Sequence, residues 1–155
     1  MTSINIPNSV ISIGERAFQN CTSFTFVEIP NSVTNIGGAA FSYCSGLTSV
    51  TIPNSITRII DWTFGHCSSL TSVTIPNSVT SIGGAAFFYC NSLTSIEIPN
   101  SVTSIGDHAF TDCSSLTSIS YTGTIAQWNA ISKGEKWHSL TPAKVVHCTD
   151  GDVPI

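Results

Sequence analysis

The 155-residue sequence predicts a solenoid of mainly β structure, built from about five 23-residue repeats and closed by a C-terminal cap. Three observations predict this fold. Four kinds of residue recur at one 23-residue spacing, each repeat reads as two short extended pieces joined by turns, and Ile and Val fill most apolar positions. The recurring residues are the Ile of an Ile-Pro-Asn turn, a second Ile, a Phe and a Cys: Ile6, Ile29, Ile52, Ile75 and Ile98; Ile13, Ile36, Ile59, Ile82 and Ile105; Phe18, Phe41, Phe64, Phe87 and Phe110; Cys21, Cys44, Cys67, Cys90 and Cys113.

The repeat is clearest in the unit that begins at Leu70. Residues 70–75 (LTSVTI) predict a short β-branched strand, which ends at a proline because proline cannot donate to a continuing ladder. A turn follows, and residues 79–82 predict a second extended piece. Gly83-Gly84 then breaks the chain, and residues 85–87 (AAF) predict a tight helical turn that places its Phe in the core.

Each unit has one apolar side that it cannot cover alone. Stacking neighbouring units about 4.8 Å apart joins these sides into one continuous core. Besides the Phe and Cys columns and Ile52, Ile75 and Ile98, the expected core columns are Leu47, Leu70, Leu93 and Leu116, with Phe24 in an earlier unit; Val50, Val73, Ile96 and Ile119; and Val33, Ile56, Val79 and Val102.

The pattern L-x-x-(V/I)-x-I-P-x-x-(V/I)-x-x-I-x-x-x-A-F-x-x-C resembles the leucine-rich repeats of BspA-like (treponemal-type) surface proteins over residues 1 to about 120. The sequence departs from that family in having Ile or Val at most leucine positions and Thr63 before Phe64, changes that we expect to leave the fold unaltered. The resemblance implies a right-handed leucine-rich repeat array of α/β type. It also implies a cell-surface or secreted location and attachment to host or matrix proteins such as fibronectin or fibrinogen.

The two ends of the array differ in sequence. The repeat register is lost from Ser118, so we divide the chain into a repeat array at 1–120 and a capping segment at 121–155, which hides the last open face of one continuous domain. At the other end, Met1 is followed almost at once by the middle of a repeat, without a signal peptide before it. We expect Met1 to begin either an expressed fragment or a natural chain whose first strand is protected otherwise. An unprotected first strand is a template for edge pairing, which makes self-association through the open N-terminal edge a further expectation.

The capping segment predicts a helix and a strand. Helix-like apolar spacing after an N-cap at Thr124 predicts a helix that Lys133-Gly134 would end. Residues 143–148 (AKVVHC) predict one more strand, followed by a turn at 150–152. The segment also resembles the closing segment of bacterial BspA-like arrays. The apolar residues at helical spacing are Ile125, Trp128 and Ile131.

Six cysteines raise three alternatives, which are disulfides, a metal site and buried thiols. Five of them hold one equivalent position per repeat beside the core Phe, and parallel side chains of one column point alongside each other rather than together. We therefore expect a column of reduced, buried thiols, with Cys148 also buried on the final strand. Zinc would need two nearby ligand pairs, and His147-Cys148 is the only adjacent pair, so no metal or other cofactor is predicted.

No catalytic set stands out in the sequence. His66 and His108 occupy positions that vary between repeats and are expected to face solvent, and 24 serines make any Ser–His–Asp choice arbitrary. Glu28 and Glu97 lie three repeats apart, about 14 Å along the ladder, which is too far for a glycosidase pair. A turn explains Asp150-Gly151-Asp152 better than a calcium site does, and no phosphate-binding glycine loop is present. We therefore expect a protein that is not an enzyme.

Composition restricts the partners. Charged residues make up only 9% of the chain, against roughly 25% in an average soluble protein, and the net charge is −4. Nucleic acid is therefore not an expected partner. The apolar runs are only a few residues long, so no membrane-spanning helix is predicted. The 24 Ser and 19 Thr leave a surface of hydroxyl groups that favours a structural or binding module.

Two surfaces are candidate binding sites. On each predicted strand, the residues that flank the core Val face solvent and form a concave sheet of hydroxyls with a carboxylate on two rungs. This face either hydrogen-bonds a polypeptide or glycan or only keeps the sheet soluble. Aromatic residues at variable positions either anchor a partner or pack over the edges of adjacent turns, and we favour packing. The candidate ligand face consists of Phe26, Glu28, Ser49, Thr51, Ser72, Thr74, Ser95 and Glu97, with a Thr column beside it at Thr25, Thr48, Thr71, Thr94 and Thr117; the candidate aromatic edge consists of Tyr43, Trp62, His66 and Tyr89, with Phe88 beside them.

The leading functional hypothesis is a non-enzymatic binding module of a cell-surface or secreted protein. Its partner would be a protein, including an extracellular matrix protein, or a glycan bound by the concave face. The alternative is a structural spacer or stalk whose ligand-binding part lies elsewhere in a longer chain, and near-identical repeats favour this alternative. Ice or mineral binding through the Thr columns would need a flat face, whereas this repeat class is expected to curve.

Overall fold

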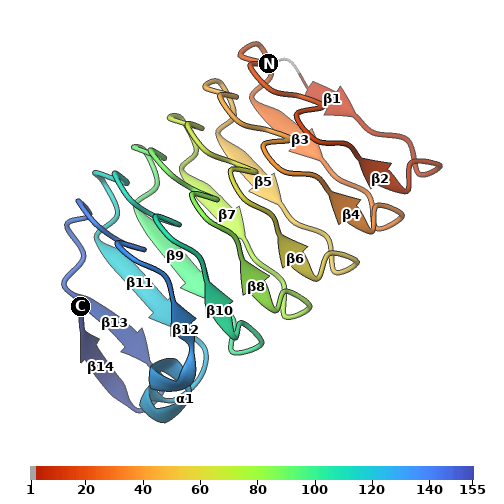
Figure 1. Cartoon of the computed structure of the whole chain (residues 1–155). Helices are drawn as coiled ribbons and strands as arrows, with labels where there is room; N and C mark the ends of the chain where they lie inside the picture. The colour runs from red at the N-terminus through yellow and green to blue at the C-terminus, as the bar shows by residue number, and fades with distance from the viewer. Residues whose placement is uncertain (1–2) are drawn as a thin grey trace.

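The chain folds into a stack of parallel β rungs. The computed structural model describes residues 3–155, so Met1 and the expectation attached to it lie outside the described residues. Figure 1 shows successive turns of the chain stacked along one axis, from β1 at the N-terminal end to β13 and β14 at the C-terminal end. The mainly β solenoid expected from the 23-residue spacing is confirmed.

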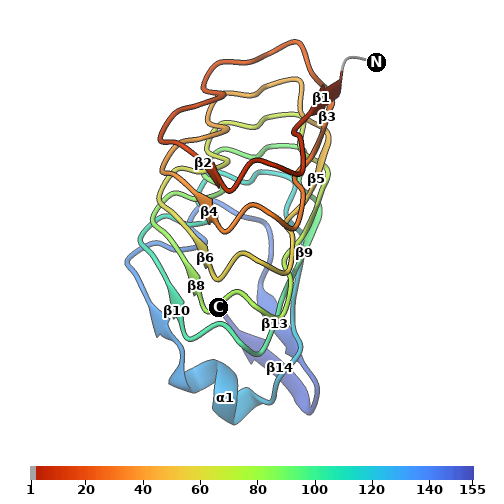
Figure 2. The same cartoon turned by 90° about the vertical axis from the view of Figure 1, so that its right-hand side faces the viewer.

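Two sets of short strands run along the stack, and Figure 2 shows them as separate columns on opposite sides of the turns. The first set contains β1 (Ser3–Asn5), β3 (Phe26–Glu28), β5 (Ser49–Thr51), β7 (Ser72–Thr74), β9 (Ser95–Ile98), β11 (Ser118–Tyr121) and β13 (Val145–Cys148), with β14 (Gly151–Pro154) at its end. The second set contains β2 (Ser12–Ile13), β4 (Asn35–Ile36), β6 (Arg58–Ile59), β8 (Ser81–Ile82), β10 (Ser104–Ile105) and β12 (Ser132–Lys133). A single helix of the described chain, α1 (Ile125–Ala130), lies near the C-terminal end.

The expected core columns are buried between the two sets of strands. Val27 pairs with Val50, and Val50 pairs with Val73, so equivalent residues of successive repeats lie directly above one another. The Phe rings stack in the same way, with centroids 5.2 to 5.6 Å apart. Phe18 and Cys21 are only partly buried because no rung covers the first one. The fully or almost fully buried rings and thiols are Phe41, Phe64, Phe87, Phe110, Cys44, Cys67, Cys90 and Cys113.

The third side of each rung consists of turns, so the tight helical turn expected at residues 85–87 is wrong. The Phe87 amide donates to the Ala109 carbonyl at 2.8 Å, and the Tyr89 amide donates to the Thr111 carbonyl at 2.9 Å. Alternate amides therefore bond to the next rung instead of closing a helix. Two non-glycine residues in each rung have φ between 51° and 63°, a conformation that L-residues normally avoid. They form two columns, Arg16, Ala39, Trp62, Ala85, His108 and Lys136, and Asn20, Tyr43, His66, Tyr89, Asp112 and Leu140.

The first glycine of Gly83-Gly84 allows close packing, which differs from the chain-breaking role expected for the pair. A Cβ added at Gly83 would lie 2.6 Å from the amide nitrogen of Asp61 on the preceding rung. A Cβ at Gly106 would lie 2.5 Å from the amide nitrogen of Gly84. This column is therefore glycine because two backbones approach closely there.

Ile60 occupies the same column in the third repeat, and the ladder is interrupted beside it. Strand β4 pairs with β2, and β6 pairs with β8, but β4 and β6 are not paired. On either side of the gap, the Thr34 amide donates to the Ile11 carbonyl and the Thr80 amide donates to the Thr57 carbonyl, both at 2.9 Å. The branched side chain of Ile60 cannot enter the space that glycine leaves, so β6 does not pair with β4. The two rungs remain joined on the turn side, for example by the Ala39 amide, which donates to the Asp61 carbonyl at 3.0 Å.

The first set of strands has a second interruption, between β7 and β9. Val73, on β7, is partly exposed, whereas Val50 and Ile96 on the neighbouring strands are buried. Hydrogen bonds on the turn side still join the two rungs, for example from the Ala85 amide to the Asp107 carbonyl at 2.8 Å. The gap is therefore confined to the first set of strands.

The 23-residue register holds up to Tyr121, slightly beyond the expected Ser118, and is then lost, but both sets of strands continue into the C-terminal segment. Ile119 pairs in parallel with Val146, and Ser104 pairs in parallel with Ser132. The spacing from Ser104 to its partner is 28 residues instead of 23, since α1 is inserted between the two sets of strands. Because of this longer spacing, the 23-residue pattern did not predict β12.

Helix α1 begins as expected and ends earlier. Thr124 is its N-cap and forms a capping box with Gln127. The helix ends at Ala130, before the expected Lys133-Gly134, because Ile131 has an extended backbone. The Lys133 ammonium donates to the carbonyls of Trp128 at 2.7 Å and Ile131 at 3.0 Å, so it satisfies the end of the helix.

The final strand is also confirmed, with one correction. Strand β13 begins at Val145, two residues after the start of the expected segment, and β14 returns antiparallel to it. Cys148, which we expected to be buried, is only partly buried. It lies at the end of β13, where β13 and β14 turn back on each other.

Candidate binding surfaces

The candidate ligand face lies on the outer side of the first set of strands, as the alternation of each strand requires. Its side chains are exposed apart from Ser49, which is partly exposed. Because the β7–β9 ladder is interrupted, Ser95 and Glu97 belong to a separate sheet from the other six residues. Parallel pairing aligns Phe26, Ser49 and Ser72 in one column and Glu28, Thr51 and Thr74 in another.

A groove of about 740 Å³ follows the ends of these strands and the Ile-Pro-Asn turns. Phe26, Glu28, Thr51, Thr74 and Glu97 line it, whereas the serines of the candidate face do not. The carboxylates of Glu28 and Glu97 thus lie on the first and last of four consecutive rungs. Three turn asparagines were not among the predicted site residues, although the repeated Ile-Pro-Asn motif places an amide directly after each strand. The asparagines that line the groove are Asn31, Asn54 and Asn77.

The hydroxyl groups fall into two populations. In the Thr column beside the candidate face, Thr48 donates to the Thr25 carbonyl and Thr71 to the Thr48 carbonyl, each at 3.0 Å. Similar bonds to the preceding rung are formed by Thr80 and Thr103 and by Ser55, Ser78 and Ser101. These hydroxyls therefore stabilise the stack. Within residues 3–155, the side-chain hydroxyls without an intramolecular hydrogen bond include all those of the candidate face: Ser49, Thr51, Ser72, Thr74 and Ser95.

The aromatic edge is a cluster of stacked rings. His66 lies 4.2 Å from Tyr43, nearly parallel to it, and 5.2 Å from Tyr89, measured between ring centroids. Phe88 lies 5.3 Å from His66 and 5.4 Å from Trp62. The packing expected across adjacent turns is therefore present. Tyr43, Trp62 and Tyr89 nevertheless remain 41 to 45% exposed, so the cluster also offers an apolar surface to a partner.

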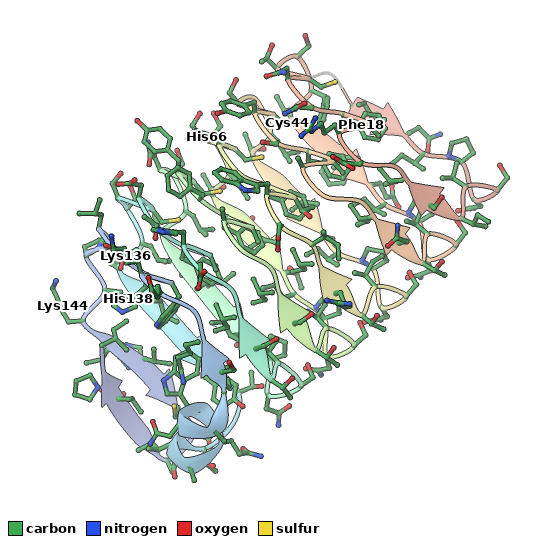
Figure 3. The ribbon with its side chains drawn as sticks, in the orientation of Figure 1. Phe18, Cys44, His66, Lys136, His138 and Lys144 are labelled. Carbon is green, nitrogen blue, oxygen red and sulfur yellow. The ribbon has the colours of Figure 1, made fainter. Side chains whose placement is uncertain are left out.

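Burial within this cluster lowers the pKa of the His66 imidazole, because its charged form loses hydration. Figure 3 shows His66 on the same side of the stack as Phe18 and Cys44, which come from preceding rungs. The ring is therefore neutral at neutral pH and acts as a flat apolar surface between its neighbours.

The cysteine column contains free thiols. The Cys44 thiol donates to the Phe18 carbonyl at 3.1 Å, and the Cys67 thiol donates to the Phe41 carbonyl at 3.2 Å. Burial raises the pKa of Cys44 to about 12 and that of Cys67 further. These thiols are weak nucleophiles, since the thiolate is the reactive form.

Among residues 3–155, no group of three or more His, Cys, Asp or Glu side chains is placed to hold a metal ion. Over the same residues, no helix is long and apolar enough to cross a bilayer.

Comparison with solved structures finds several close folds. A leucine-rich cell-surface protein from Faecalibacterium prausnitzii is 41% identical, with a TM-score of 0.82 over 84% of this chain and 34% of that one. A leucine-rich repeat protein from Bacteroides ovatus is 34% identical, with a TM-score of 0.80 over 93% of this chain and 39% of that one. The T. pallidum leucine-rich repeat protein is 28% identical, with a TM-score of 0.74 over 94% of this chain and 72% of that one. This chain thus spans little more than a third of the first two proteins.

Comparison with curated proteins gives no match. A family model, in contrast, matches most of the chain. It describes a BspA type leucine rich repeat region and finds six copies over residues 1–117. The repeat columns, the stacked β rungs and this match agree, and the chain therefore belongs to the BspA-type leucine-rich repeat family.

Proposed function

We propose that this chain is a non-enzymatic binding module of a cell-surface or secreted protein, and that its groove binds a protein or glycan. The groove of about 740 Å³ carries the proposal. It combines exposed hydroxyls, turn amides and two carboxylates with the ring of Phe26, which are groups that hydrogen-bond and pack against a polypeptide or sugar chain. The unpaired hydroxyls of Thr51 and Thr74 support it, because the Thr hydroxyls that hold the stack together are already bonded.

The location and the non-enzymatic role come from the family. Leucine-rich repeat folds are in general scaffolds for protein interaction, and the similar protein from F. prausnitzii is described as a cell-surface protein. An extracellular matrix protein is the proposed class of protein partner, by resemblance to BspA-like proteins.

A spacer role is the second candidate. The hydroxyl ladders favour it, because they explain much of the Ser and Thr content without any ligand. In this case the binding part would lie outside this chain, and the groove would be an ordinary solvent-exposed surface.

Solid-phase binding separates the two candidates. The chain is tested against fibronectin, fibrinogen and a glycan panel, together with a Thr51→Lys/Thr74→Lys variant that fills the groove with two long cationic side chains. The control is Thr57→Lys/Ser114→Lys, which adds the same charge at exposed positions outside the groove. Saturable binding that falls at least tenfold in the groove variant alone supports the proposal. Binding that is equal in both variants, or absent throughout, overturns it in favour of the spacer.

A further inference from the structure

A second cavity lies on the turn side of the stack, away from the groove. Its volume is about 320 Å³, and its lining includes Trp62 and Phe88 of the aromatic cluster together with Asp61 and Asp107. Gly84 and Ala85 line its base, and His108 lines it on the C-terminal side. We call this cavity the turn slot.

The slot exists because the fourth repeat has small residues where its neighbours have large ones. In one column Gly84 lies between Asp61 and Asp107, and in the next column Ala85 lies between Trp62 and His108. The flanking rungs are two ladder steps apart, which is about 10 Å. Since atoms in contact are about 3.5 to 4.0 Å apart, this gap accommodates one planar group between the two rungs.

The carboxylates at the slot are held in place but retain acceptor capacity. Asp61 Oδ1 accepts a hydrogen bond from the Gly84 amide at 2.7 Å, and Asp107 Oδ1 accepts one from the Glu135 amide at 2.7 Å. Both side chains are exposed, and among residues 3–155 neither forms an ion pair. Asp61 therefore reaches toward Gly84 in the slot and has no cationic partner from the chain, whereas the Asp107 carboxylate is turned toward the following rung and contributes its charge from there.

The combination of aromatic rings and fixed carboxylates selects a cation. Trp62 is 41% exposed, and an indole ring attracts a cation placed over its face. A guanidinium group suits this geometry better than an ammonium group, because it is planar, stacks on rings and donates several N–H bonds in one plane.

We propose that the turn slot binds an arginine side chain of a polypeptide partner. The guanidinium group occupies the layer above Gly84 and Ala85, beside Trp62, and donates to the free oxygen of Asp61, while the negative charge of Asp107 on the next rung adds attraction. This site is separate from the groove and does not depend on it, since no residue lines both.

The first test uses small probes and NMR titration of the whole chain at pH 8. The probes are Nα-acetyl-arginine amide, Nα-acetyl-lysine amide and Nα-acetyl-citrulline amide, in which citrulline has the planar shape without the charge. Saturable shifts of the Trp62 indole N–H are expected with the arginine probe, at least fivefold weaker with lysine and absent with citrulline. Equal affinities for arginine and citrulline, or for arginine and lysine, overturn the proposal.

Matched variants locate the site. Ala85→Trp fills the slot and is tolerated by the backbone, because Trp62 occupies the equivalent position of the preceding repeat with the same positive φ. Ala39→Trp makes the same change two repeats earlier in the same column, outside the slot. Asp61→Asn/Asp107→Asn removes the charges and keeps oxygens that accept the two amide bonds, with Glu15→Gln/Asp112→Asn as its control. Arginine binding should fall at least tenfold in each slot variant and remain within twofold in each control, whereas unchanged binding in either slot variant overturns the assignment.

Discussion

At its C-terminal end the solenoid finishes with a helix and an antiparallel strand, whereas its first rung at the N-terminal end has neither. Trp128 of α1 is 1% exposed and packs near Tyr121 and Trp137. At the other end, Phe18 is partly exposed and an apolar hollow of about 370 Å³ remains, lined in part by Ile4 and Val10. The same columns of residues thus experience different environments at the two ends, and equivalent substitutions should have different effects there.

The largest expected contrast is in thiol reactivity. At pH 8, the partly buried Cys21 of the first rung should react with iodoacetamide, while Cys44 should react far more slowly, because it is buried and its pKa is raised from 9.0 to about 12, so little thiolate forms. Peptide mass spectrometry after timed labelling measures both rates. In denaturant all six cysteines should be labelled equally, and rapid native labelling of Cys44 would contradict the burial of the column.

The same shifts predict a loss of stability at high pH. The thiols of Cys44, Cys67 and Cys90 have pKa values raised mainly by burial, so the unfolded chain loses these protons at lower pH than the folded chain does. Their contribution to stability is complete below about pH 9 and declines as the pH rises from there towards 12. Urea unfolding midpoints at pH 8, 9, 10 and 11 measure this decline. A Cys67→Ala variant should show a smaller decline, and a midpoint independent of pH would refute the argument.

Core truncation should also separate the two ends. Phe110→Ala, next to the capped end, should cost about 3–5 kcal/mol of unfolding free energy because the ring is fully buried and leaves a cavity. Phe18→Ala should cost only about 1 kcal/mol, since this ring is half-buried and one of its sides faces the open end. Urea denaturation followed by circular dichroism measures both values. Equal losses would mean that the open end is covered in solution.

Two substitutions in the glycine column should differ in their effect on stability by a smaller amount, and the difference comes from one close contact. Gly106→Ala should cost about 2 kcal/mol, because its Cβ would lie 2.5 Å from the Gly84 amide nitrogen. Gly14→Ala should be neutral or slightly stabilising, since nothing lies within 4 Å of a Cβ there. Thermal melts of the two variants provide the comparison, and a large loss in Gly14→Ala would show that another backbone contacts the first rung.

The sequence was sufficient for the array and its core because equivalent residues recur at a fixed spacing. It did not reveal the conformation of the turns, since Ala85 and Tyr89 are not residue types that indicate positive φ. Strand β12 of the last rung was not predicted because α1 lengthens the spacing before it, and the β4–β6 gap was not predicted because Ile60 looks like another apolar residue. The residues of the candidate ligand face lie exposed on one side of the strands, as their alternation predicts, and their role in binding stays a prediction. The groove could not be predicted because it depends on turn asparagines from several rungs, and the turn slot could not be predicted because it depends on Gly84. Both require knowledge of which residues lie side by side in neighbouring rungs.

The smallest expected effect is weak self-association through the open end, which we propose from the contrast in edge strands. Strand β1 has a neighbour on one side only, and in the same first rung Ile11, directly before β2, is 70% exposed. The opposite edge strand, β14, is blunted by Asp152 and Pro154, a charge and a residue without an amide donor. Two copies related by a two-fold axis would bring their N-terminal hollows together and pair their β1 edges.

Sedimentation equilibrium over a wide range of protein concentration tests this contact. Ile11→Lys should keep the chain monomeric at concentrations where the unchanged chain shows a rising average mass, because two buried ammonium groups would face each other across the axis. Leu140→Lys is the matched control, since Leu140 is 72% exposed at the capped end and should leave the association unchanged. If Leu140→Lys reduces the average mass and Ile11→Lys does not, the chain associates through its capped end. The proposal of association through the open N-terminal end would then be wrong.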